Sequence, residues 1–290
     1  MKKLFGGLNI TWPKLIISAV ILGIYTGIMA MAPFAKDTSL ADISIYFDRW
    51  VLFGILIIMN SKSAKESALK CFVFFLISQP LVFLVQVPFN AYGWGIFVYY
   101  KYWFMWTLLT IPMGYIGYHM KQNKLWGVLI LAPMLLLVGL QYYGYVHETV
   151  TFFPRHLYSC IFCVITMILY SLFVFDNKKN VLICTALTAV ILLATTGWAV
   201  THKSAYDTQL LSSGGERTGI EYDDSYKVYL ADPDYGTVKI VYIESIETYM
   251  VQAHFTKLGD TELTLESPSG EKTVYKLTVY RNSYEVERKP

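Results

Sequence analysis

The chain has 290 residues, of which 55% are hydrophobic and 16% are charged, and its formal net charge is +3 at pH 7. This balance argues against a nucleic-acid-binding protein, and four cysteines in so long a chain argue against a disulfide-rich secreted scaffold. The apolar residues concentrate in the first 200 positions, which indicates a polytopic membrane protein with a polar tail.

A membrane-spanning helix needs about 20 mostly apolar residues to cross about 30 Å of hydrocarbon. Seven segments meet this demand, and we expect a seven-helix all-α transmembrane domain over residues 1–200. The expected spans are 15–32, 43–60, 71–89, 95–118, 125–145, 157–175 and 181–200. The second span reaches full length only if its helix begins before Asp48 and Arg49.

The lysines predict the orientation, because short cytoplasmic loops accumulate basic residues. Ten lysines fall on one side of the seven spans, whereas the other side holds only Lys36, Arg49, Lys101 and Arg155. We therefore expect a cytoplasmic N-terminus, an extracellular tail and a location in the plasma membrane. The first span resembles a signal peptide, but Pro33 would follow the cleavage site directly, so we expect an uncleaved helix.

All four cysteines, Cys71, Cys160, Cys163 and Cys184, lie in predicted spans. We expect no disulfides, which fits the exported proteins of a Gram-positive bacterium. Cys160-Ile-Phe-Cys163 is formally a C-x-x-C pair, as in membrane thiol oxidoreductases of the vitamin K epoxide reductase type. The alternative, which we prefer, is that these cysteines pack as small apolar residues.

Ionisable residues inside a membrane are costly and therefore indicate candidate functional sites. The expected topology places Asp42 and seven further candidates near the outer interface: Asp48, Arg49, Lys101, His147, Glu148, Arg155 and His156. Together they suggest a site for proton transfer, metal binding or a charged lipid head group. The alternative is a snorkelling Lys101, a paired helix start at Asp48 and Arg49, and solvated loop residues at the other positions.

Two amides, Gln79 and Gln86, fall in the third span, and Pro80 interrupts the same span near its middle. Transporters often build binding sites from broken helices with polar groups at the midplane. Prolines and single amides also occur in passive bundles, where neighbouring helices satisfy the freed carbonyls.

The tail predicts a polar linker over residues 201–225 and a small all-β domain over 226–290. Val251, Ala253 and Phe255 alternate with polar residues, and similar alternation continues to Val279. This pattern predicts an antiparallel β-sandwich. Five acidic residues near the first turns suggest either calcium binding or ordinary solvated turns: Glu221, Asp223, Asp224, Asp232 and Asp234.

The stretch 259–279, with Ser267-Pro-Ser-Gly270 between two alternating runs, resembles the closing hairpin of bacterial immunoglobulin-like (Ig-like) domains. That resemblance implies a spacer or binding module. Residues 72–89 and 99–114 resemble segments of uncharacterised multi-pass membrane proteins of Gram-positive bacteria, over residues 12–125. This second resemblance implies a membrane protein and no particular activity.

We therefore expect a non-enzymatic plasma-membrane protein that displays an extracellular Ig-like sandwich to an envelope protein or polysaccharide, with the lipid bilayer as its other partner. The first alternative is a transporter or lipid-handling protein with an outward-facing polar cavity. A second is an outer-face membrane enzyme using His147, Glu148, His156 and Asp48. No motif points to a cofactor, a metal ion or a nucleic-acid partner.

Overall fold

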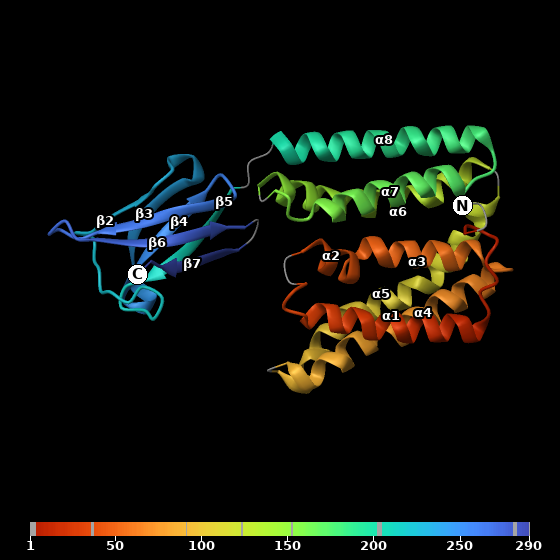
Figure 1. Cartoon of the computed structure of the whole chain (residues 1–290), viewed down its shortest axis with the longest axis horizontal. Coiled ribbons are helices and arrows are strands. Elements are labelled where there is room, and N and C mark those ends of the chain that lie inside the picture. Colours follow the sequence, from red (N-terminus) through yellow and green to blue (C-terminus); the bar gives the residue numbers. More distant parts are fainter. Residues whose placement is uncertain are drawn as a thin grey trace. The chain divides into compact units, whose positions relative to one another are not determined.

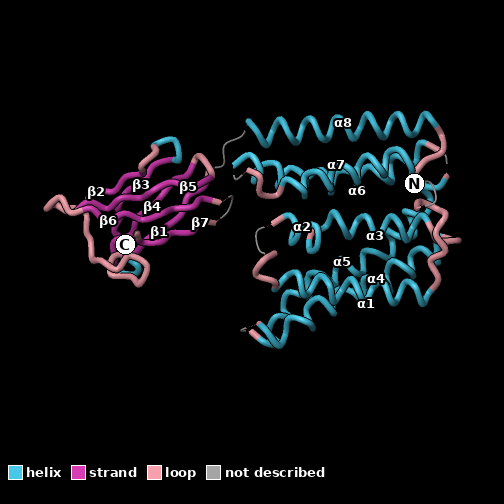
Figure 2. The backbone as a smooth tube through the Cα atoms, viewed as in Figure 1, coloured by secondary structure: helices cyan, strands magenta, loops and turns pink. Residues whose placement is uncertain are grey.

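The computed structural model describes residues 4–35, 38–90, 92–122, 124–151, 153–201, 205–280 and 283–289. The chain divides into two compact units, Met1–Ala199 and Val200–Pro290. The first consists of helices and the second of strands, as Figure 2 shows.

Eight α-helices make up the described part of the helical unit (Figure 1). They are α1 (Trp12–Met31), α2 (Ser39–Ile45), α3 (Phe47–Met59), α4 (Ala64–Gln86), α5 (Phe97–Gly117), α6 (Leu125–Thr151), α7 (Leu157–Phe173) and α8 (Lys178–Thr201). Three short 3₁₀ helices join them: η1 (Val87–Phe89), η2 (Gly93–Ile96) and η3 (Tyr118–Lys121).

Four helical segments among the described residues are long and apolar enough to cross a membrane: α1, α4 continued through η1, α6 and α8. The prediction of seven spans is thus supported for four segments. Helix α7 has only 17 residues. Helix α5 has 21 residues but is rich in tyrosine and tryptophan, which weakens its apolar character.

The expected second span is not one continuous helix, because Tyr46 interrupts it. Tyr46 has an extended backbone (φ −81°, ψ 173°) and separates the seven-residue α2 from the 13-residue α3. Asp48 and Arg49 therefore lie in the first turn of α3 and are buried. Their expected depth near one membrane face stays a prediction.

Helices α1 and α4 pack closely, and two glycines on α1 make this possible. A Cβ atom at Gly23 would lie 2.6 Å from the Ser78 carbonyl oxygen, and one at Gly27 would lie 2.8 Å from that of Val82. These distances leave no room for a side chain, so the small-residue pair of α1 sets the approach of the two helices.

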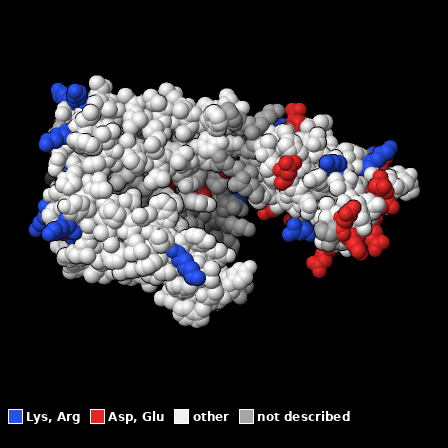
Figure 3. Space-filling view, turned by 180° about the vertical axis from the view of Figure 1, so that it is seen from behind, with Lys and Arg blue, Asp and Glu red and all other residues white. Residues whose placement is uncertain are grey.

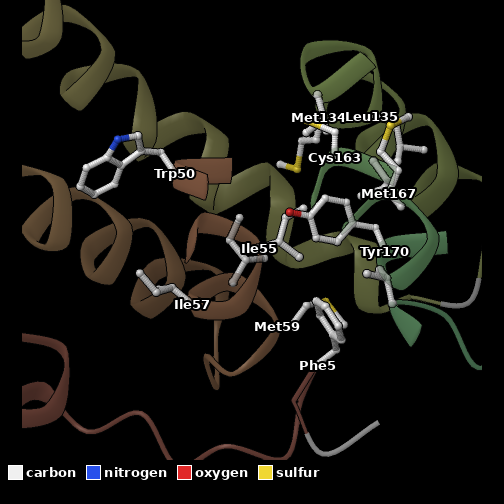
Figure 4. Packing of buried hydrophobic residues seen from close by; sticks show 14 of the residues in the cluster. Phe5, Trp50, Ile55, Ile57, Met59, Met134, Leu135, Cys163, Met167 and Tyr170 are labelled. Atoms are coloured by element: carbon white, nitrogen blue, oxygen red, sulfur yellow. The ribbon is translucent and has the colours of Figure 1, made fainter. Parts of the chain in front are cut away.

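The core of the helical unit gathers side chains from α3, α6 and α7 and from the segment before α1 (Figure 4). Phe5 packs edge-on against Tyr170, with ring centroids 6.2 Å apart. The hydroxyl of Tyr170 points toward Ile55 of α3 in Figure 4. Helix α3 is thus a central element of the unit despite its short length.

Basic residues gather at one end of the helical unit, next to a wide uncharged band (Figure 3). Side chains join the loops that carry these residues: Lys70 Nζ donates to the Ile10 carbonyl at 2.6 Å, and Lys121 Nζ donates to that of Ser61 at 2.5 Å. Lys70 and Lys121, two of the lysines that predict the orientation, therefore connect neighbouring segments of the chain.

The β unit contains two antiparallel sheets around one apolar core. The first sheet has the order β1-β4-β3 and the second the order β2-β5-β6-β7. The strands are β1 (Tyr206–Ser212), β2 (Lys227–Leu230), β3 (Gly236–Ile243), β4 (Thr248–Phe255), β5 (Gly259–Glu266), β6 (Lys272–Val279) and β7 (Tyr284–Arg288), with η4 (Pro233–Tyr235) and η5 (Glu244–Ile246) between them.

The period-two pattern predicts the inward face of this unit correctly. Val251, Phe255, Leu263, Leu277 and Val279 are all fully buried. The sequence pattern identifies these residues because alternate side chains of a strand point to the same face.

The segment expected to be a linker differs from the expectation, because β1 lies within it and pairs with β4. Tyr222, also in the expected linker, is buried and donates its hydroxyl hydrogen to the Leu211 carbonyl at 2.6 Å. The β unit therefore begins by Tyr206, and Gly214 forms part of a turn at φ +68° after β1.

Candidate functional site

The first turn of α3 places an aspartate and an arginine inside the helical unit. Asp48 is completely buried, and its carboxylate accepts a hydrogen bond from the Arg49 backbone N–H at 2.8 Å. This bond satisfies one of the free N–H groups at the helix N-terminus, where a negative charge is also favoured. The thiol of Cys163 on α7 lies 3.5 Å from the same carboxylate.

A second carboxylate, Asp42 of α2, joins α2 to α7. Its Oδ2 atom lies 2.5 Å from Nδ1 of His156 and accepts a hydrogen bond from the Ser159 hydroxyl at 2.6 Å. Asp42 and Ser159 are buried, and the His156 side chain is only 13% exposed. His156 and Ser159 follow Asp42 by 114 and 117 positions in the chain, and both contact the same oxygen atom of its carboxylate.

Two features position the His156 ring. Its backbone adopts the left-handed conformation (φ 59°, ψ 4°) just before α7, which turns the chain into the helix. Its ring stacks on Tyr145 of α6 at a centroid distance of 6.3 Å and an interplanar angle of 11°. Left-handed backbone at a residue other than glycine or asparagine is uncommon, and it often occurs where a side chain has a function.

Arg49 is held by α1. Its guanidinium donates to the Thr26 hydroxyl, which in turn donates to the Ser44 carbonyl at 3.1 Å. The guanidinium carbon also lies 5.0 Å from the Trp50 ring centroid and 5.6 Å from that of Tyr25. These cation–π contacts stabilise a desolvated positive charge.

We call Asp42, Asp48, Arg49, His156 and Ser159 the buried polar cluster. Helix α7 links the two carboxylates of this cluster, because the Ser159 hydroxyl donates to Asp42 and the Cys163 thiol lies 3.5 Å from Asp48. The cluster also has an unused hydrogen-bonding group nearby: the buried Tyr145 hydroxyl finds no partner among the described residues. A buried hydroxyl without a partner costs about 1–3 kcal/mol.

The geometry suits reversible proton binding better than bond cleavage. A single proton between an imidazole and a carboxylate 2.5 Å apart can reside on either group. In a serine-hydrolase triad the serine donates to histidine, whereas Ser159 donates to Asp42. The arrangement therefore does not activate Ser159 as a nucleophile.

Of the seven outer candidates, Asp48, Arg49 and His156 belong to the buried polar cluster. Lys101 is exposed on α5, in agreement with a snorkelling lysine. His147 is buried on α6, with its ring 6.1 Å from that of Tyr143, while Glu148 and Arg155 are half-buried.

The sequence indicates Asp42 as an interfacial group but does not identify Ser159 as a member of the buried polar cluster, or Thr26 and Tyr145 as its neighbours. One signal for Ser159 was present. It follows His156 by three residues and so lies on the same face of α7 as Cys163. Nothing in the sequence connects α7 with α1 or α2.

The two amides of α4, Gln79 and Gln86, differ in their surroundings. Gln86 donates to the Val82 carbonyl of its own helix at 2.8 Å. Gln79 is buried, and its amide nitrogen has no hydrogen-bond partner among the described residues. It lines a groove whose other walls are mainly apolar and aromatic.

The four cysteines are free and buried, and Cys160 and Cys163 form no disulfide with each other. Within the described residues, no group of three His, Cys, Asp or Glu side chains is arranged to hold a metal ion. In the β unit Asp223 accepts from the Ser225 N–H at 2.9 Å, and Asp232 accepts from that of Asp234 at 2.9 Å. These acidic residues thus stabilise turns.

Comparisons of the chain with protein-family models, with curated proteins and with solved structures find no match. The arguments for function therefore rest on the geometry described above.

Proposed function

We propose that the helical unit is a seven-span proton-coupled transporter or lipid-handling protein of the plasma membrane, and that the buried polar cluster binds and releases its proton. Its lysine-rich end would face the cytoplasm. The observation that carries the proposal is the shared oxygen of Asp42, which contacts both His156 and Ser159.

The energetics favour this proposal over a passive anchor. Burying a charged group in a membrane protein costs at least about 2.5–3.5 kcal/mol, and this cluster includes two carboxylates, one arginine and one histidine. A bundle whose only task is to hold a tail outside the cell does not need such groups. Proton-coupled proteins do need them, because a proton must enter a site shielded from water.

Infrared difference spectroscopy tests the proposal on the full chain reconstituted in liposomes. Between pH 5 and pH 8 we expect a change in the carbonyl-stretch region of protonated carboxylic acids. Asp42→Asn should remove or shift it, since Asp42 shares its proton with His156. Glu266→Gln in the β unit is the matched control. Identical spectra for the wild type and for both Asp42→Asn and Asp48→Asn would contradict the proposal.

A second candidate function is display of the β unit, and the division of the chain into two compact units favours it. On this proposal the β unit is an extracellular Ig-like module that binds an envelope protein or polysaccharide. A truncated chain that ends at Val200 separates the two functions. Display predicts that it loses binding to isolated cell envelopes, whereas transport predicts that the pH-dependent carboxyl signal survives in it.

A further inference from the structure

The apolar groove of the helical unit is lined by side chains of α3 other than those in the buried polar cluster. Phe47, Trp50, Val51, Gly54, Ile55 and Ile58 of α3 line it, whereas Asp48 and Arg49 point elsewhere. Residues of α4, α5 and α6 complete its walls. Trp50 borders both sites, because its ring lies 5.0 Å from the Arg49 guanidinium carbon. The identity of the ligand in the groove does not depend on the proposed proton site.

We propose that this groove binds one acyl chain of an ester-linked membrane lipid, with the ester carbonyl accepting a hydrogen bond from Gln79. The ligand must be mainly hydrocarbon, because almost the whole lining is apolar, including Phe47, Trp50, Phe75, Trp103 and Trp106.

Gln79 supplies the polar end of the site. Two threonines also line the groove, but their hydroxyls are hydrogen-bonded within α5. Thr107 donates to the Trp103 carbonyl at 3.0 Å, and Thr110 donates to that of Thr107 at 2.6 Å. Gln79 is 3% exposed, and no described residue accepts from its amide nitrogen. Leaving a buried donor without an acceptor costs about 1–3 kcal/mol, which a ligand carbonyl would recover.

The position of Gln79 along the groove fits a chain with its carbonyl at one end. Among the lining residues of α4, Gln79 lies nearest the C-terminal end, and Cys71 lies eight residues before it, or about 12 Å along the helix. Helix α4 runs antiparallel to α5 (Figure 2), so Gln79 shares its end of the groove with Trp103. The hydrocarbon would extend from there toward Gly114, about 16 Å from Trp103 along α5.

The groove is also accessible from the bilayer. Trp106 and Met113 of α5 line it and are 42% and 37% exposed. Helix α5 packs mainly against α4 and only slightly against α6. In a membrane the surface between α5 and α6 would face lipid, so an acyl chain can enter sideways without crossing water.

Gly54 offers a direct way to fill the groove. It is a lining residue, and a Cβ atom built on it meets no atom within 4 Å. Gly54→Leu should therefore occupy the space of the ligand without displacing backbone. Gly197→Leu is the matched control, because Gly197 lies on α8 and a Cβ atom there also meets nothing within 4 Å.

The test uses the full chain in nanodiscs that contain phosphatidylcholine with a photoactivatable acyl chain, followed by mass spectrometry of the labelled peptides. We expect labelling of α3 and α5 that excess unlabelled phosphatidylcholine displaces. Gly54→Leu should abolish most of it, and Gly197→Leu should not. Labelling that is not displaced, or that is equal in both variants, would reduce the contact to the ordinary lipid shell and overturn the proposal.

An ether-linked analogue, which lacks the carbonyl, tests the role of Gln79. The wild type should favour the ester lipid by about fivefold, which corresponds to one hydrogen bond of about 1 kcal/mol. Gln79→Leu should remove this preference while the displaceable labelling of α3 persists. Equal labelling by ester and ether lipids in the wild type would overturn the assignment of Gln79.

Discussion

Asp42 and Tyr145 both contact His156, but they differ in their own hydrogen bonding. The Asp42 carboxylate contacts both the His156 ring and the Ser159 hydroxyl. The Tyr145 hydroxyl has no hydrogen-bond partner among the described residues. Stability measurements on single substitutions can distinguish these two situations.

Ser159→Ala is expected to destabilise the helical unit by about 1.5–3 kcal/mol, the usual contribution of a hydrogen bond to a charged group. The substitution removes the hydroxyl that donates to Asp42 at 2.6 Å. Tyr145→Phe should instead be neutral or stabilising, because it removes a buried hydroxyl that makes no hydrogen bond. Thermal unfolding in detergent measures both. A loss of stability in Tyr145→Phe equal to that in Ser159→Ala would show that the hydroxyl is hydrogen-bonded.

Tyr222 allows a prediction about pH in the β unit. Burial raises the pKa of Tyr222 to about 12, whereas an unfolded tyrosine has a pKa of about 10. Between these values the folded state binds more protons than the unfolded state, so stability falls as pH rises from about 10 to about 12.

In Tyr222→Phe this loss of stability at high pH should be smaller. Part of it should remain, because burial also raises the pKa of Tyr206 to about 12. At pH 7 the variant should lose about 1 kcal/mol, because the Leu211 carbonyl loses its donor. Urea unfolding of residues 200–290 at pH 7 and pH 11 measures both effects. If the variant and the wild type lost the same stability between the two pH values, the assignment to Tyr222 would be contradicted.

Among the helices, the contact between α1 and α4 depends on Gly23. Gly23→Ala is expected to destabilise the helical unit by about 1–3 kcal/mol, since its methyl group would lie 2.6 Å from the Ser78 carbonyl oxygen. Gly197→Ala, with open space around the added atom, should be neutral or stabilising by up to about 1 kcal/mol. Equal changes in thermal stability for the two variants would contradict the close packing of α1 against α4.

Element positions followed from the sequence where one face of an element is apolar. The strands β4, β5 and β6 were predicted from period-two alternation, and α6 and α8 from length and hydropathy. The break at Tyr46 was missed, because residues 39–53 contain no proline or glycine. The strand β1 was missed because its polar neighbours resemble a linker and its pairing with β4 is distant in sequence.

The candidate site was predictable only in part. Asp48, Arg49 and His156 attract attention because charged groups near a predicted span are costly. Which of the seven outer candidates converge depends on contacts across more than 100 residues, such as that of His156 with Asp42. The groove behind α3 has no sequence signature, since aromatic residues near an interface equally indicate an ordinary aromatic belt.

Across the chain as a whole, the two units have separate cores. Residues 200–290 are therefore expected to fold when expressed alone, with a cooperative unfolding transition and β-type circular dichroism. The apolar residues of both sheets meet in one core, and its largest fully buried side chains include Tyr275 and Phe255. A fragment without a cooperative transition would show that the β unit needs the helical unit to fold.

The proposed function depends above all on the exchange of a proton between Asp42 and His156 inside the membrane-embedded helical unit. Nitrogen-15 NMR of the full chain with labelled histidine measures this exchange, and His156→Gln identifies the relevant signal. We predict that Asp42→Asn changes the nitrogen-15 signals of the His156 ring, because Nδ1 loses the carboxylate oxygen that lies 2.5 Å away. Signals of His156 that are identical in the wild type and in Asp42→Asn would contradict the contact on which the proposed proton exchange depends.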